Sequence, residues 1–87
     1  MFDWDEQNVR HIATHGIRPQ EAEEAFLDPN AVTRETGVYD DEYREALIGI
    51  TRRGRLVLVI IAERGRLFRV VSAYEATGRE ETLYFRR

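Results

Sequence analysis

The residues with the clearest chemical capacity stand near the end of the chain, in the stretch RVVSAYEATGREETLYF. Arg69 interrupts an apolar strand pattern, and Arg79, Glu80 and Tyr84 follow in a short helical pattern. The planar guanidinium fork of arginine fits a phosphate group, while a glutamate or a tyrosine can exchange a proton. The stretch is therefore either a solvated final helix or a site that handles phosphate.

The spacing of these residues predicts that they meet. Only about four residues separate the end of the predicted strand from the start of the helix, and each spans at most about 3.6 Å. We expect Arg69, Arg79 and Glu80 to converge at this junction, with His15 or Tyr84 closing the site. Two arginines there would repel each other unless an anion or Glu80 lay between them.

Glu80 also has a structural interpretation. The sequence Thr77-Gly78-Arg79-Glu80 matches a capping box, in which the glutamate accepts a hydrogen bond from the backbone at the helix start. From spacing alone, this structural interpretation is favoured over a role as acid or base.

Two histidines stand four residues apart on the first predicted helix, so His11 and His15 project from nearly one side. They are compatible with a proton-exchanging pair, or with a surface His11 and a His15 at the helix end. A zinc-protease pattern needs a glutamate directly after the first histidine, where Ile12 stands, and no third ligand is indicated. We expect no metal ion and no cofactor.

The charge is divided unevenly along the chain. Residues 1–43 carry three arginines against eleven acidic residues, and residues 44–87 carry ten against five, within a net charge of −3. All basic residues are arginine, which suits nucleic acid, although a GC-rich coding sequence produces the same bias. The acidic total is unusual for a nucleic-acid binder. We expect an arginine-rich face formed by the last strand and the last helix.

The composition predicts one cytoplasmic domain over residues 1–87. An apolar content of 43% is enough for a modest core, and the longest apolar run, Leu56 to Ala62, is too short to cross a bilayer. The acidic beginning lacks the positive region of a signal peptide. The absence of cysteine excludes disulfides and thiolate metal sites.

Two helices are predicted first. EQNVRHIATH follows a capping Asp3 or Asp5 and precedes Gly16, with an apolar stripe of Val9, Ile12 and Ala13. PQEAEEAFL carries Pro19 in its first turn, with Ala22, Ala25 and Phe26 on its buried face. Asp28-Pro29-Asn30 ends this second helix.

Strands follow. AVTRET is a possible short strand, residues 37–41 read as a loop, and YREALIGIT places Ala46, Ile48 and Ile50 on one face. The run Leu56 to Ala62 is expected to be a central strand covered on both faces. After an ERG turn, RLFRVVSA forms the last strand, with Ser72 on the face opposite Arg69 and read as a hydrogen-bonding residue at the strand end. The fold class is therefore α+β, with two N-terminal helices on a three- to four-stranded antiparallel sheet and a C-terminal helix.

The two ends of the chain resemble the BrnT family of small bacterial toxins. FDWDEQNVRHIATHGI resembles the family's opening, with its Trp-Asp pair and a His-Gly at the end of the first helix. ERGRLFRVVSAYEATGREETLYF resembles the closing strand and helix, and EEAFLDP with the central strand also fits. The sequence departs from the family at Tyr74, where arginine is usual.

The resemblance implies a RelE-like, microbial-ribonuclease-like fold and metal-independent endoribonuclease activity on RNA. It also implies a cognate antitoxin that neutralises the toxin and binds operator DNA. The residues that match the family's site are His15, Glu80 and Tyr84 as candidate catalytic groups, and Arg69 and Arg79 as candidate phosphate ligands. The alternative hypothesis is a catalytically weak or inactive member that acts as a protein–protein interaction module.

Overall fold

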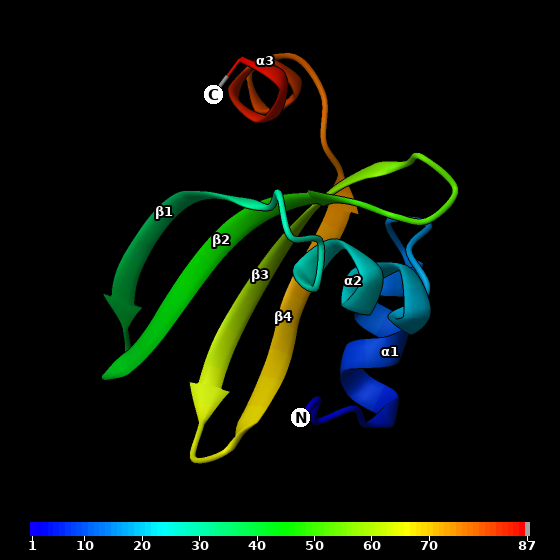
Figure 1. Ribbon diagram of the computed structural model, residues 1–87. Helices are drawn as coiled ribbons and strands as arrows, with labels where there is room; N and C mark the ends of the chain where they lie inside the picture. The colour runs from blue at the N-terminus through cyan, green and yellow to red at the C-terminus, as the bar shows by residue number, and fades with distance from the viewer. Residues whose placement is uncertain (87) are drawn as a thin grey trace.

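The computed structural model describes residues 1–86, which form three helices and a four-stranded antiparallel sheet (Figure 1). The elements follow in the order α1 (Glu6–Ala13), α2 (Pro19–Phe26), β1 (Val32–Tyr39), β2 (Glu42–Ile50), β3 (Leu56–Arg64), β4 (Leu67–Glu75) and α3 (Arg79–Phe85). The strands pair in sequence order, so the sheet is a meander. The predicted fold class is confirmed.

The cap of α1 is reciprocal. The Asp5 carboxylate accepts from the Asn8 backbone N–H at 2.9 Å, and the Asn8 side chain accepts from the Asp5 N–H at 2.8 Å. The helix ends before Gly16, which has a φ of +75°. Glycine adopts this left-handed conformation with little strain because it has no Cβ. Ile12 is buried as predicted, but Ala13 is exposed and Asn8 is buried in its place, where its amide donates to the Val70 carbonyl.

Helix α2 lies against the sheet through small residues. Ala22 and Ala25 are fully buried, and Phe26 is half-buried against the same core, as expected. The approach is closest at Gly49 of β2, where an added Cβ would lie 1.9 Å from the Ala25 carbonyl oxygen. A glycine at this position is therefore what allows the helix to contact the strand.

Strand β1 is longer than the sequence predicted. Residues 37–41 were expected to form a loop, but β1 continues to Tyr39 and only Asp40 and Asp41 make the turn. Both have positive φ, +51° and +65°, as a two-residue hairpin turn requires. Aspartate tolerates this conformation, so the loop composition was correct but the loop itself is much shorter.

Each edge strand contains a bulge. The register of β1 on β2 shifts between Thr33 and Glu35, which leaves Arg34 without a partner residue. The register of β4 on β3 shifts between Ile61–Val70 and Ile60–Ser72, which leaves Val71 as the extra residue. An extra residue inverts the alternation of side chains beyond it. Ser72 therefore lies on the same face as Arg69, and the prediction that it lies on the opposite face is wrong.

The sheet separates two apolar clusters. We call one side the helical-pair face: Leu47, Val57, Val59 and Ile61 pack there with residues of α1 and α2. We call the other side the α3 face. On it, Ile48, Leu56, Leu58 and other residues pack with Tyr84 of α3. Strand β3 contributes alternate residues to both clusters, so the predicted central strand is confirmed.

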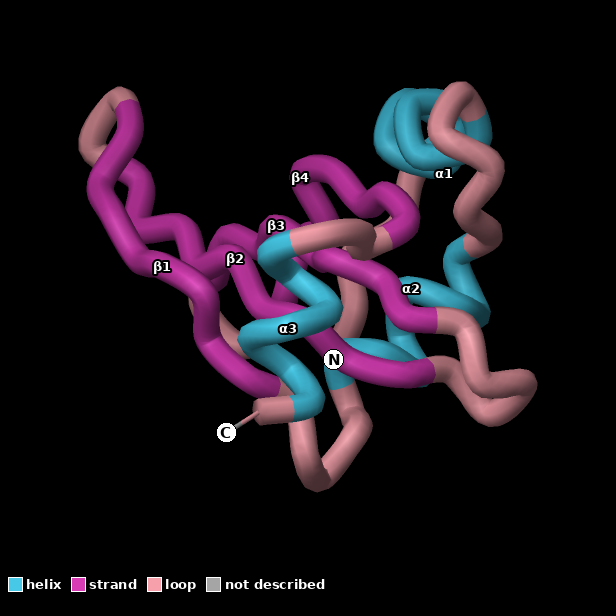
Figure 2. Tube along the Cα trace, turned by 90° about the horizontal axis from the view of Figure 1, so that it is seen from above, coloured by secondary structure: helices cyan, strands magenta, loops and turns pink. Residues whose placement is uncertain are grey.

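Helix α3 contacts β1 and β2, whereas α1 lies beyond β4 at the other side of the sheet (Figure 2). Gly78 is the N-cap of α3 and provides no side chain, so the predicted capping box is only half made. Its Glu80 half is present, because the Glu80 carboxylate accepts from the Thr77 N–H at 3.3 Å. None of the helices within residues 1–86 is long and apolar enough to cross a membrane.

Candidate functional site

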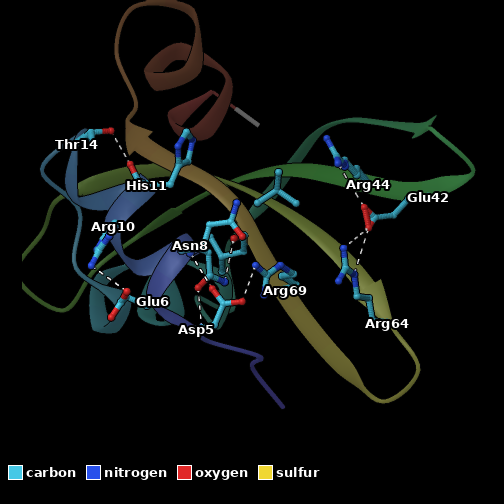
Figure 3. Close-up of a pocket in the computed structure, with 13 residues that line it drawn as sticks. Asp5, Glu6, Asn8, Arg10, His11, Thr14, Glu42, Arg44, Arg64 and Arg69 are labelled. Atoms are coloured by element: carbon cyan, nitrogen blue, oxygen red, sulfur yellow. Dashed lines mark hydrogen bonds and ion pairs between the residues drawn. The ribbon is translucent and has the colours of Figure 1, made fainter.

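A groove of about 960 Å³ opens between α1 and the α3 face of the sheet (Figure 3). Its charged lining residues are Asp5, Glu6, Arg10, Glu42, Arg44, Arg64 and Arg69, and His11 also lines it. Positive charge is therefore in slight excess here, although the whole chain has a net charge of −3. We call this cavity the arginine groove.

The sheet places two of these arginines side by side. Arg44 of β2 and Arg69 of β4 both pair in register with Ala62 of β3. Neighbouring strands lie about 4.8 Å apart, so the two Cα atoms are separated by roughly 10 Å across the strands. Ala62 is buried and small, and it forms a floor between the two long side chains. Both guanidinium groups therefore rise from one row of the α3 face.

Arg69 is held by the N-terminus of α1. Its Nη2 lies 2.9 Å from Asp5 Oδ2 and its Nη1 lies 3.7 Å from Asp3 Oδ2, and its side chain is 15% exposed (Figure 3). A backbone hydrogen bond from Asn8, together with Arg69, lowers the pKa of Asp5 below its ordinary value. The capping residue of α1 therefore also fixes the position of Arg69 at the groove.

Arg44 and Arg64 share one carboxylate at the far wall of the groove. Glu42 lies 3.4 Å from Arg44 Nη2 and 3.1 Å from Arg64 Nη2, and the hydrogen bond from Arg64 is the main reason that its pKa is lowered. The Nε of Arg44 is buried, and no group within residues 1–86 accepts a hydrogen bond from it. Such an arrangement costs about 1–3 kcal/mol, and costs of this kind are common at functional positions.

A fourth arginine reaches the α3 face through the β1 bulge. Arg34 Nη1 lies 3.5 Å from Glu80 Oε2, and Nη2 lies 3.2 Å from Glu35 Oε1. A hydrogen bond to Tyr74, with the charges of Glu35 and Glu80, raises the pKa of Arg34. Glu80 therefore holds Arg34 in place, in addition to its contact with the helix start.

The two histidines face the end of β4 beyond its bulge. His11 Nε2 lies 3.2 Å from the Ser72 Oγ, and the ring of His15 lies 5.5 Å from the His11 ring and 6.0 Å from the Tyr74 ring. Both histidines are exposed, and Ser72 and Tyr74 are half-buried. The bulge at Val71 thus brings the Ser72 hydroxyl to His11 and the Tyr74 ring to His15.

The five residues predicted for the site do not form a single cluster. Arg69 is the third residue of β4, about 20 Å from the strand end at roughly 3.3 Å per residue, so it cannot join Arg79 and Glu80. Arg79 is exposed and does not line the arginine groove. Tyr84 is 5% exposed and donates its hydroxyl to Asp28 Oδ2 at 2.6 Å, a structural contact. His15 lies beside Tyr74, and Glu80 lies beside Arg34.

The arginine-rich face is real, but its origin differs from the prediction. Each strand contributes one arginine to the α3 face, and the last helix is not needed for it. These residues are Arg34 of β1, Arg44 of β2, Arg64 of β3 and Arg69 of β4. Meander pairing brings them together, because residues far apart in sequence become neighbours across the sheet.

A profile of the family described as ribonuclease toxin, BrnT, of type II toxin-antitoxin system matches residues 4–80. The chain belongs to the BrnT family. No curated protein matches the chain significantly. The BrnT match spans both histidines, the four arginines of the α3 face and Glu80, and it ends before Tyr84. A BrnT toxin of a type II system has an RNA target and an antitoxin partner.

The sequence pattern did not place Arg34, Arg44 and Tyr74 together on the α3 face. The position of Arg44 was predictable from the sequence, because it alternates with Ala46 and Ile48 and so shares their face. The positions of Tyr74 and Arg34 were not predictable, because each depends on a bulge. Alternation alone does not show where a strand carries an extra residue.

Proposed function

We propose that this member of the BrnT family cleaves RNA without a metal ion, in the arginine groove. The observation that carries the proposal is the row formed by Arg44, Ala62 and Arg69. Two guanidinium groups on one face, about 10 Å apart at their Cα atoms, fit a phosphodiester backbone held between them. They supply the positive charge that a developing phosphorane requires.

The carboxylates that pair with these arginines are displaced by substrate in this scheme. Asp5 is about half exposed, whereas its partner Arg69 is 15% exposed. A carboxylate that remains half in water contributes modestly to an ion pair, so a phosphate can replace it. In the free protein the carboxylates hold the long arginine side chains in a single arrangement, which reduces the entropy lost on binding.

His11 and His15 supply the proton transfers in the proposed mechanism. One neutral imidazole accepts the proton of the ribose 2′-OH as O2′ forms its bond to phosphorus. The P–O5′ bond breaks, and the other imidazole, protonated, donates its proton to O5′. The products are a 2′,3′-cyclic phosphate and a 5′-hydroxyl. Glu80 then acts by positioning Arg34, and Tyr84 anchors α3.

Cleavage of a single-stranded RNA in the presence of a chelator tests the metal-independent scheme. We expect Arg44→Ala and Arg69→Ala each to lower the cleavage rate about 100-fold, as expected when a stabiliser of transition-state charge is removed. Arg53→Ala, in the exposed β2–β3 turn, is the matched control and should leave the rate unchanged. Full activity in both groove variants, with unaltered melting curves, would move the site elsewhere.

Glu80→Gln separates positioning from acid–base chemistry. Glutamine keeps an acceptor for the Thr77 N–H but loses the charge that holds Arg34. Positioning predicts a loss below about 10-fold, whereas a catalytic carboxylate predicts about 100-fold. In the two-histidine scheme the pH profile of cleavage is bell-shaped, and His11→Ala or His15→Ala removes one limb of it.

The remaining parts of the proposal concern partners and fold relationship. We propose that a cognate antitoxin neutralises the chain, that operator DNA is bound only through that antitoxin, and that the fold is RelE-like. Growth arrest on expression, relieved by the neighbouring small reading frame, is the expected result. A chain that binds such a partner but neither arrests growth nor cleaves RNA would instead be an interaction module.

A further inference from the structure

A second, smaller cavity of about 340 Å³ lies on the α3 face next to the arginine groove. Arg44 lines both cavities. The other residues that line the smaller cavity include Arg34, Tyr39, Ala46, Ile60 and Tyr74. The volume is at the lower end of the range for small-molecule sites, about 300–1,000 Å³.

The aromatic rings stand at opposite sides of an apolar floor. Tyr39 comes from β1 and Tyr74 from β4, the two edge strands, whereas Ala46 and Ile60 are register partners on β2 and β3 between them. The half-buried Ile60 offers contact area to a flat group. Aromatic walls over an aliphatic floor suit a planar, partly apolar ligand.

The ring of Tyr39 is held in place although it is 50% exposed. It lies over Gly37, where an added Cβ would be 3.2 Å from Tyr39 Cε2, and the Arg44 Cζ lies 5.7 Å from the ring centroid. Gly37 is also the register partner of Arg44. The glycine therefore makes room for the ring, and the cation–π contact keeps it beside the groove.

The charges around the cavity fit a nucleotide. Arg34 and Arg44 border it, together with two carboxylates that already have partners. Glu35 is paired with Arg34 at 3.2 Å, and Glu45 accepts a hydrogen bond from the Thr33 hydroxyl at 2.6 Å. A nucleotide whose base occupied the cavity would place its phosphate toward Arg44, the residue shared with the groove.

We propose that this cavity binds one unstacked base of the RNA strand whose phosphate occupies the arginine groove. The inference rests on the proposed function and adds to it the substrate class, a single-stranded RNA with one splayed base. Proteins that bind single-stranded nucleic acid stack bases on aromatic side chains, which tolerates different sequences.

The test uses a 2′-O-methyl RNA oligonucleotide, which binds but lacks the 2′-OH needed for cleavage, with one abasic residue moved along the strand. Wild type should show one position at which loss of the base weakens binding about 10-fold. Tyr39→Ala should bind the intact strand about 10-fold more weakly. It should lose no further affinity when the base at that position is removed. Tyr39→Phe should behave as wild type, because stacking does not need the hydroxyl.

Tyr43→Ala is the matched control. Tyr43 belongs to the same hairpin and is 51% exposed, but it pairs with Val38 on the opposite face. Its variant should bind like wild type. An equal abasic penalty in wild type and Tyr39→Ala would overturn the base site, as would unchanged RNA affinity of Tyr39→Ala, whatever its effect on a protein partner. If wild type bound no RNA at all, the proposed function would fail together with this site.

Discussion

The two faces of one sheet differ in what covers them. On the helical-pair face, Val57 and Val59 of β3 are fully buried under two helices. On the α3 face, Leu58 of the same strand is fully buried, but Ile60 is half-buried and Ala62 lies between two arginines. The same strand thus serves a closed core on one side and a partly open surface on the other.

The difference follows from the length of the final helix. Helix α3 has seven residues and packs mainly on β1 and β2, with Tyr84 also in the cluster of Leu56 and Leu58, so it covers only one end of its face. The uncovered end must carry side chains that tolerate water, and β2, β3 and β4 supply Arg44, Arg64 and Arg69 there. The exposed end of the α3 face is open to the binding that we propose, because the helical-pair face already provides the core.

Burial of a charge gives the largest contrast between the faces. Val59→Asp should lose on the order of 5 kcal/mol, comparable with the whole stability of a domain this small, because an unpaired carboxylate is buried. Ile60→Asp, one residue away on the α3 face, should lose about 1–2 kcal/mol because water and nearby arginines solvate the charge. Chemical denaturation measures both. Equal losses would show that the two faces are equally closed.

Gly49→Ala tests the closeness of α2 to the helical-pair face. The added methyl would lie 1.9 Å from the Ala25 carbonyl oxygen, so the helix must move, at a cost of about 3 kcal/mol. Gly54→Ala is the control: it meets nothing within 4 Å, and its φ of +84° costs about 1 kcal/mol. If the melting temperatures of the two variants coincided, close packing at Gly49 would be disproved.

Tyr84→Phe tests whether the closed end of the α3 face is structural. Loss of the hydrogen bond to the Asp28 carboxylate should reduce the free energy of unfolding by about 1.5 kcal/mol. RNA cleavage by the folded variant should be unchanged. A rate loss of 100-fold at full stability would instead restore Tyr84 to the catalytic group.

The smallest effect concerns Glu21, at the edge of the helical-pair face. Burial opposes its ionisation, but hydrogen bonds from the Arg18 backbone and the Arg55 side chain more than compensate and lower its pKa below 4.5. A lowered native pKa stabilises the fold above pH 4.5, and this contribution is lost as the pH falls through the native value. The free energy of unfolding of wild type should exceed that of Glu21→Gln by about 1 kcal/mol at pH 7, and this difference should vanish in acid. A difference that persisted unchanged at pH 3 would rule out this ion pair as its source.

Most of the elements and their order were predictable from local patterns. The unbroken run of β3 and the alternation in β2 gave the sheet, and the Asp5 and Pro19 signals gave the helix starts. The candidate site was harder to predict from the sequence, because it depends on how the strands pair. Arg34 and Tyr74 reach it through bulges, and Arg69 is the third residue of a nine-residue strand, far from the strand–helix junction at which the spacing placed it.

Asn8 has a consequence for the order in which the chain folds. Its amide joins α1 to the Val70 carbonyl across 62 residues of sequence, whereas each hairpin of the meander closes a short loop. Contacts between distant segments carry the larger loop-closure cost, so we expect the hairpins to form before α1 docks on β4. The arginine groove would then be completed last and would open first. Native-state hydrogen exchange should show the α1 amides exchanging with a lower opening free energy than those of β3, and equal values would contradict this order.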